Sequence, residues 1–136
     1  MIYDTKLALA VRDDLQEWQK LNVAAFLVGG LVGQSPEIAG EPYRDGDGTV
    51  YAPLVREPIF VFSATAETLA RTRRRAISRG LAPAIYTAGL FATTNDADNR
   101  AAVAAVGAET LDLVGVAVHG ERKIIDKIVN GLKRHA

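Results

Sequence analysis

The chain of 136 residues contains no cysteine, which excludes disulfide bonds and metal sites built on thiolates. It has two histidines, His119 and His135, too few to favour a metal site built on imidazoles. Neither sign of charge dominates, because 16 lysines and arginines balance 16 aspartates and glutamates. The chain therefore has no long-range field that steers it towards nucleic acid, and one barrier to self-association is absent.

Long apolar runs are also missing. The longest, residues 23–32, is about half as long as a membrane helix requires, and Gly29 and Gly30 interrupt it. The N-terminus lacks the basic segment of a signal peptide, so we expect a cytoplasmic protein without membrane association. Hydrophobic residues make up 49% of the chain, enough to build the core of a single domain over residues 1–136.

Strand-like and helix-like segments alternate along the chain. Four short apolar segments are predicted to be buried strands: residues 6–12, 58–63, 84–87 and 111–118. Four others have helical periodicity or helix caps, with Thr65 and Asn95 as N-caps: residues 21–32, 65–79, 95–106 and 121–133. The order predicts an α/β three-layer sandwich, in which helices cover both faces of a mixed four-stranded sheet.

The segment between the first helix and the second strand is rich in glycine and proline. Residues 33–48 are predicted to form a loop, and residues 49–51 a short edge strand. Asp45-Gly-Asp-Gly48 is similar to the start of an EF-hand loop, but Arg56 stands where that loop needs a glutamate. A tight turn explains the motif better, so we predict neither a metal nor a cofactor.

Gly29-Gly-Leu-Val-Gly33 lies within or at the end of the first predicted helix. A dinucleotide-binding loop would lie between a strand and the start of a helix, so this segment is not one. Small residues on a helix allow it to approach a sheet closely, at a cost of roughly 1 kcal/mol per glycine in helix propensity. We therefore expect these glycines to mark close packing of the helix on the sheet.

The one basic cluster lies in the second predicted helix and consists of Arg71, Arg73, Arg74, Arg75 and Arg79. Three of the five form a stripe spaced by four residues, which is typical of a solvated helix face. Arg73 is aligned with Leu69 and Ile77 on the apolar side, so its guanidinium either reaches the rim or binds an anion in a cleft. His119 follows the last strand and could act as an acid or base, but the sequence shows no partner for it.

Several short sequence words occur in the order found in type 2 peptidyl-tRNA hydrolases. Residues 7–15 and then 22–26 resemble the opening strand and helix of that family, and Ile85-Tyr-Thr-Ala-Gly89 resembles the end of a later strand. Residues 111–117 and then 125–132 resemble the closing strand and helix. The resemblance implies a peptidyl-tRNA hydrolase type 2-like fold for most of the chain, excluding residues 34–57.

A bacterial family of unknown function with the same fold is more similar still. The words shared with it are Leu21–Phe26, Asn99–Ala101, Leu113–Gly115 and Asp126–Leu132. The chain therefore resembles this family of unknown function more than it resembles the type 2 peptidyl-tRNA hydrolases.

The resemblance places other residues at the catalytic positions of the hydrolase. Asn22 stands at the lysine position, if one inserted residue is allowed, and Thr87 stands at the aspartate position before Ala-Gly. Phe26 replaces a glutamine and Phe91 replaces a threonine. Loss of the cation and the carboxylate predicts loss of hydrolase activity, and the two rings predict a more apolar cleft.

These observations leave three hypotheses. We favour a non-hydrolytic domain, expected to be a homodimer, that binds a small-molecule ligand or a partner in the cleft. The cleft residues would be Asn22, Phe26, Thr87 and Phe91, with Arg73 or His119 near the rim. The second hypothesis is a peptidyl-tRNA or aminoacyl-ester hydrolase with a rebuilt site, whose RNA binding rests on the arginine stripe alone. The third is a homo-oligomeric interaction module whose cleft has no function.

Overall fold

Strand β1 (Thr5–Arg12) lies at the centre of a mixed five-stranded sheet in the computed structural model, which describes residues 3–136. The strand order is β5-β6-β1-β4-β7. Strand β4 (Ile59–Ala64) runs parallel to β1, and β6 (Leu113–Glu121) runs antiparallel to β1 on its other side. Strand β5 (Ala84–Thr87) pairs antiparallel with β6 and forms one edge. The mixed α/β architecture predicted from the sequence is confirmed.

The sheet has five strands, and the prediction of four was wrong. Strand β7 (Lys133–Arg134) pairs antiparallel with β4 and forms the second edge. The helix predicted over residues 121–133 ends early, because α4 covers only Arg122–Ile128. Gly131 then adopts a φ of 89°, which glycine reaches without strain, and the chain returns along β4.

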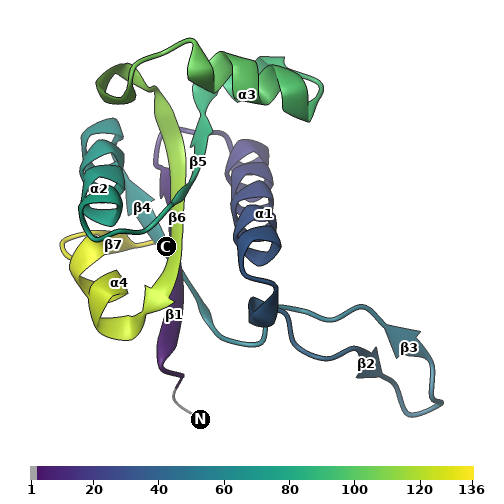
Figure 1. The fold of residues 1–136 in the computed structure, drawn as a ribbon. Helices are drawn as coiled ribbons and strands as arrows, with labels where there is room; N and C mark the ends of the chain where they lie inside the picture. The colour runs from purple at the N-terminus through teal and green to yellow at the C-terminus, as the bar shows by residue number, and fades with distance from the viewer. Residues whose placement is uncertain (1–2) are drawn as a thin grey trace.

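Helices cover both faces of the sheet, as predicted (Figure 1). Helix α1 (Glu17–Gln34) packs on one face, and α2 (Ala66–Ser78) and α4 pack on the other. Alternate residues of β1 serve the two cores, so that Leu7 and Leu9 face α1 while Ala8 and Ala10 face α2 and α4. Among residues 3–136, no helix has the length and apolar character needed to cross a membrane.

The close approach of α1 to the sheet depends on Gly115 of β6, and the predicted role of the helix glycines was wrong for Gly29 and Gly33. A Cβ atom on Gly115 would lie 2.5 Å from Val23 Cγ1 and 2.9 Å from Leu27 Cδ1. Gly29 and Gly33 are exposed, and a Cβ atom there would meet nothing within 4 Å. The small residue that the packing needs is therefore on the strand.

Both predicted N-caps are confirmed. Thr65 Oγ1 accepts a hydrogen bond from the backbone N–H of Thr68 at the start of α2. Asn95 Oδ1 accepts one from the backbone N–H of Asp98 at the start of α3 (Asp96–Ala104), which lies beyond the end of the sheet (Figure 1). The connecting 3-10 helices are η1 (Pro36–Ile38), η2 (Ala88–Ala92) and η3 (Ala108–Thr110).

Residues 39–55 leave the body of the molecule as an arm (Figure 1). Near its tip β2 (Tyr43–Arg44) pairs antiparallel with β3 (Val50–Tyr51), and a bridge between Ala39 and Val55 closes its base. The short strand predicted at residues 49–51 therefore belongs to a separate hairpin and not to the edge of the main sheet. Every residue from 41 to 54 is exposed.

The Asp45-Gly-Asp-Gly48 motif forms the turn of this hairpin, as the sequence indicates. Asp45 Oδ1 accepts hydrogen bonds from the backbone N–H groups of Asp47 at 2.9 Å and Thr49 at 3.0 Å. Its Oδ2 accepts one from the Tyr51 hydroxyl at 2.7 Å. The bond from Tyr51, followed by those from the backbone, holds the pKa of Asp45 below its ordinary value.

Candidate functional site

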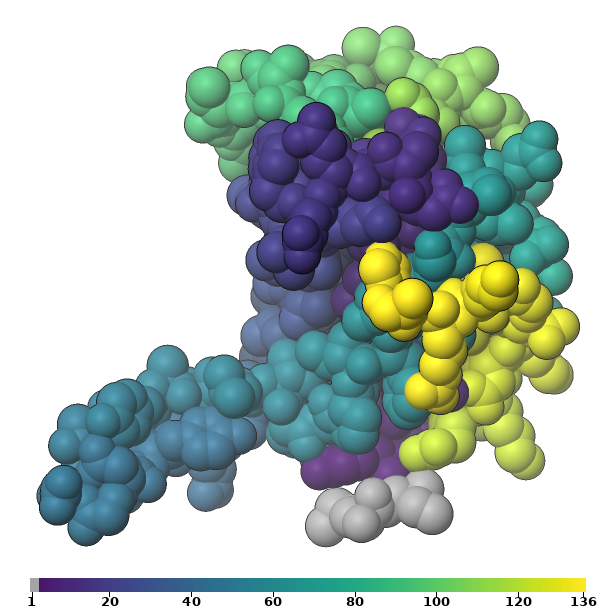
Figure 2. All heavy atoms as spheres, turned by 180° about the vertical axis from the view of Figure 1, so that it is seen from behind, coloured from purple at the N-terminus to yellow at the C-terminus, as the bar shows by residue number. Residues whose placement is uncertain are grey.

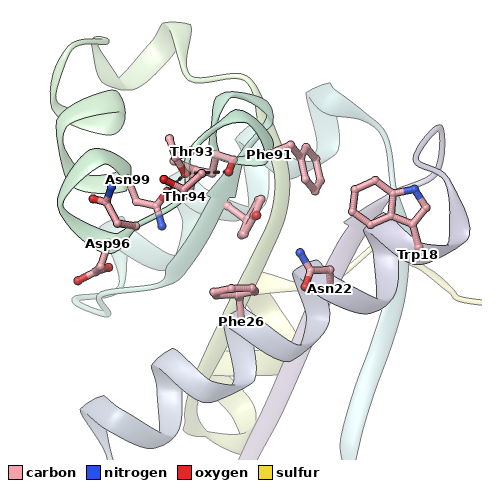
Figure 3. Close-up of a pocket in the computed structure, with 11 residues that line it drawn as sticks. Trp18, Asn22, Phe26, Phe91, Thr93, Thr94, Asp96 and Asn99 are labelled. Atoms are coloured by element: carbon pink, nitrogen blue, oxygen red, sulfur yellow. Dashed lines mark hydrogen bonds between the residues drawn. The ribbon is translucent and has the colours of Figure 1, made fainter.

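A pocket of about 310 Å³ opens between the N-terminal half of α1 and the chain that follows β5 (Figure 3). Its first wall is a row on α1, because Trp18, Asn22 and Phe26 are spaced by four residues and share one face of the helix. Its second wall comes from Tyr86 of β5 and from residues 90–99. A volume of this size lies at the lower end of the range for small-molecule sites.

Four aromatic rings in mutual contact line the pocket. The ring centroid of Phe91 lies 5.9 Å from that of Trp18 and 5.1 Å from that of Tyr86, and Tyr86 lies 5.8 Å from Phe26. Trp18 and Phe26 are nevertheless 56% and 58% exposed. Large apolar side chains gathered at a concave surface and open to solvent are typical of a binding site.

The polar groups of the pocket are amides and hydroxyls. Thr93 and Asn99 are hydrogen bonded to each other, and the Thr93 hydroxyl is also 2.9 Å from the carbonyl oxygen of Leu90. Asn95 uses its side chain to cap α3. The Asn22 amide points from α1 into the space between the walls (Figure 3), and within residues 3–136 it has no hydrogen-bond partner. It is therefore available to a ligand.

The pocket carries little charge. Of the described residues that line it, Asp96 alone is charged at neutral pH, and it forms an ion pair with Arg100 one turn along α3. Burial raises the pKa of Tyr86 above its ordinary value, so the hydroxyl is protonated at neutral pH. The site therefore offers aromatic faces and neutral hydrogen-bonding groups.

The structure brings together three of the six residues predicted for the cleft. Asn22, Phe26 and Phe91 line the pocket. Thr87 does not, because it is buried at the end of β5 opposite Leu113, which packs in the core on the α2 and α4 face. A register shift separates Thr87 from Tyr86, and Tyr86 is the residue that faces α1.

Arg73 and His119 also lie away from the pocket. Arg73 belongs to α2, on the opposite face of the sheet from α1. His119 lies near the far end of β6, where its Nε2 is 2.9 Å from Oε1 of the buried Glu57. The Thr5 hydroxyl donates a hydrogen bond to the other oxygen of Glu57 at 2.8 Å. His119 thus has a partner that the sequence did not reveal, in a buried group at the base of the arm.

The arginine cluster contributes contacts that stabilise the fold. Arg75 Nη1 donates hydrogen bonds to the carbonyl oxygens of Asn130 at 2.8 Å and Ile128 at 3.4 Å, so it caps the C-terminal end of α4. Arg74 forms an exposed ion pair with Glu109 at 3.1 Å. These two guanidinium groups are therefore engaged within the chain.

Sequence reasoning missed Trp18, Tyr86, Thr93 and Asn99 of the pocket. A signal for Trp18 was available, because it is the single tryptophan and lies one helical turn before Asn22. Thr93 and Asn99 reach the pocket only because the chain after β5 folds back over α1, and no local pattern shows that.

Comparison with known proteins identifies the family. A family model described as a protein of unknown function, DUF2000, matches residues 5–136. The chain belongs to the DUF2000 family. The match confirms the membership of a family of unknown function that the sequence words indicate, and the likeness to peptidyl-tRNA hydrolases stays a prediction.

A solved structure is similar over the whole DUF2000 chain. It is the structure of Atu0240 from Agrobacterium tumefaciens str. C58, described as a protein of unknown function. The two chains are 47% identical, with a TM-score of 0.96 over 99% of this chain and 100% of the other. A search of curated proteins finds no match.

Proposed function

We propose that this DUF2000 chain is a cytoplasmic binding domain without hydrolase activity, whose ligand is a small uncharged molecule with a flat ring. The observation that carries the proposal is the row of exposed rings beside the unpaired amide of Asn22. A ring that covers Trp18 and Phe26 would remove apolar surface from water, which stabilises a complex by about 25 cal/mol per Å². The Asn22 amide would orient the ligand, because it offers both a donor and an acceptor.

The charge of the pocket supports an uncharged ligand. A charged group that enters loses its hydration and needs an opposite charge to offset that loss. The only ionised side chain among the described lining residues is Asp96, which Arg100 already neutralises. Neutral planar molecules with hydrogen-bonding edges fit these walls better than phosphates, carboxylates or amines.

The geometry also supports the absence of hydrolase activity. The rebuilt hydrolase of the second hypothesis needs Asn22 to hold an oxyanion while Thr87 holds a water molecule. Asn22 lines the pocket, whereas Thr87 is 7% exposed and lies opposite Leu113 of the other core. The two groups therefore do not converge on one reacting centre. A turnover assay on peptidyl-tRNA checks this point, and hydrolysis that both Asn22→Ala and Thr87→Ala abolish would favour the hydrolase.

The single tryptophan makes ligand binding directly measurable. Trp18 is in contact with Phe91 at the mouth of the pocket, so its fluorescence should change when a ring enters. We expect neutral planar heterocycles to quench or shift this emission in a saturable titration. Asn22→Ala should weaken the binding of such a compound roughly tenfold, the equivalent of one lost hydrogen bond.

The matched control is Ile77→Ala, which shortens an apolar side chain that is 52% exposed on the opposite face of the molecule. Its affinity should equal that of the native chain, whereas Phe26→Ala should weaken binding. The proposal would be overturned if charged and neutral compounds alike left the Trp18 emission unchanged. It would also be overturned if binding survived both the Asn22 and the Phe26 substitutions.

A further inference from the structure

The two faces of the sheet are covered unequally by the chain itself. Helices α2 and α4 share one face, whereas the other is covered by α1 over β5, β6 and β1, with the short helices η1 and η2 at its margins. On the α1 face β4 therefore presents Ile59 and Val61 to solvent, each 38% exposed, and we call these two residues the β4 strip. Their neighbour Phe62 is buried in the core on the opposite face.

The β4 strip continues onto α1. Residues on a helix advance by about 100°, so Leu21 and Val28 lie on the flank opposite Phe26 and hence on the side of α1 towards β4. Leu21 is 66% exposed. On its other side the strip is bordered by the C-terminal segment, because the backbone N–H of His135 donates a hydrogen bond to the carbonyl oxygen of Val61. Figure 2 views the molecule from this side, with the C-terminal segment in yellow.

The arm exposes a second set of apolar side chains. Tyr43, Val50, Tyr51 and Leu54 are each between 52% and 63% exposed. Tyr43 and Tyr51 are directly paired in the hairpin, so they lie on the same face of it. A two-stranded hairpin has marginal stability alone in water. The arm projects away from the body in Figures 1 and 2, so its own chain does not cover these residues.

We propose that the arm packs on the β4 strip and on Leu21 of a second copy of this chain, and that two copies exchange arms around a two-fold axis. The arm leads directly into β4, so each copy carries the donor surface and the β4 strip close together in the chain. An isologous interface requires this arrangement, because the same patch must serve on both partners.

The amount of exposed surface fits a stable dimer. Seven side chains of the arm, the β4 strip and Leu21 are each 38% to 66% exposed. Together they present on the order of 700 Å² of mostly apolar surface, against roughly 800 Å² per partner in a standard interface. Crystal-packing contacts and weak transient complexes bury less surface area than this, so the patch is large enough for a specific interface.

Charge also favours a second copy as the occupant. The arm residues 41–54 include Glu41, Asp45 and Asp47 against the single cation Arg44, a net charge of −2. The β4 strip has an exposed cation beside it, because Lys133 pairs with Ser63 and so lies on the same face as Val61. The whole chain has no net charge, so two copies approach without long-range repulsion.

Molar mass in solution tests the proposal. We expect the native chain to sediment as a dimer, and the arm variant with Tyr43→Ser and Leu54→Ser to dissociate at least roughly tenfold more readily. Both positions are exposed, so circular dichroism and the melting profile should show an intact fold. The control Ile77→Ser removes an equally exposed apolar side chain from α2 and should leave the dimer unchanged. A native chain that is monomeric, or an arm variant that remains as dimeric as the native chain, would overturn the proposal.

Cross-linking tests which surfaces meet. The chain has no cysteine, so each introduced thiol is unique. A short thiol-specific cross-linker should join a chain carrying Leu54→Cys to a second chain carrying Val61→Cys. It should not join chains carrying Ile77→Cys and Val61→Cys. Equal yields for the two mixtures would place the contact elsewhere and refute arm exchange.

Discussion

Gly115 sets the distance between α1 and the sheet. A methyl group there would lie 2.5 Å from Val23 Cγ1 and 2.9 Å from Leu27 Cδ1, closer than packed carbon atoms approach. We expect Gly115→Ala to lower the free energy of unfolding by about 1–3 kcal/mol, because the core must shift to admit it. Urea denaturation measures the change.

A matched glycine on α1 gives the opposite expectation. Gly33 is exposed, and an added Cβ atom there meets nothing within 4 Å. Gly33→Ala should therefore raise the free energy of unfolding by up to about 1 kcal/mol through helix propensity. Equal stability of the two alanine variants would show that the contacts at Gly115 do not limit the packing.

The buried carboxylate of Glu57 accepts a hydrogen bond from the Thr5 hydroxyl and contacts the His119 ring. It therefore links β1, β6 and the base of the arm. Glu57→Ala should cost about 1–3 kcal/mol of stability, because it removes the acceptor of the Thr5 hydroxyl and leaves a space beside the His119 ring. Glu57→Gln should cost less, since its amide can still accept from Thr5. Chemical denaturation of the two variants compares them, and identical losses would mean that packing volume matters here more than pairing.

The elements of the fold differ in how far local sequence determines them. Thr65 and Asn95 cap their helices through partners three residues away, so a local pattern was sufficient to predict both helix starts. The end of α4 was not predictable in this way. Val129 and Leu132 continue the apolar pattern beyond the helix because the chain packs on the same core after the helix has ended. The pairing of β7 with β4 is a non-local contact.

The turn of the arm should respond to acid. Hydrogen bonds from Tyr51 and from the backbone lower the pKa of Asp45 in the folded chain, so its ionised form stabilises the turn. That stabilisation is present above the ordinary aspartate pKa of about 3.9 and is lost as the pH falls through the lower folded value. The amide resonances of Asp47 and Thr49 should report the loss in an NMR titration. Asp45→Asn should show no such transition in this range, and a transition that persisted in this variant would exclude Asp45 as its cause.

At the scale of the whole molecule, three of the six residues predicted for the cleft lie together and three do not. Asn22, Phe26 and Phe91 line one pocket because α1 and the chain after β5 form its two walls. Thr87 was chosen as the facing residue, but Ala84 and Tyr86 pack on the α1 side, so alternation along β5 turns Thr87 to the other face. Which of the two alternating sets of side chains faces α1 is decided by packing against β6 and α1, and that non-local contact is not visible in the four residues of β5.

Helix α1 contributes to two surfaces, the wall of the pocket and the proposed contact with a second copy. Leu21 and Asn22 are consecutive, yet the first belongs to the patch that we assign to a second copy and the second points into the pocket. A rotation of α1 that brings Asn22 closer to a ligand would also move Leu21, which contacts the second copy. Ligand binding in the pocket and dimerisation are then thermodynamically linked. If dimerisation changes the affinity for the ligand by a given factor, the ligand changes the affinity between the two copies by the same factor.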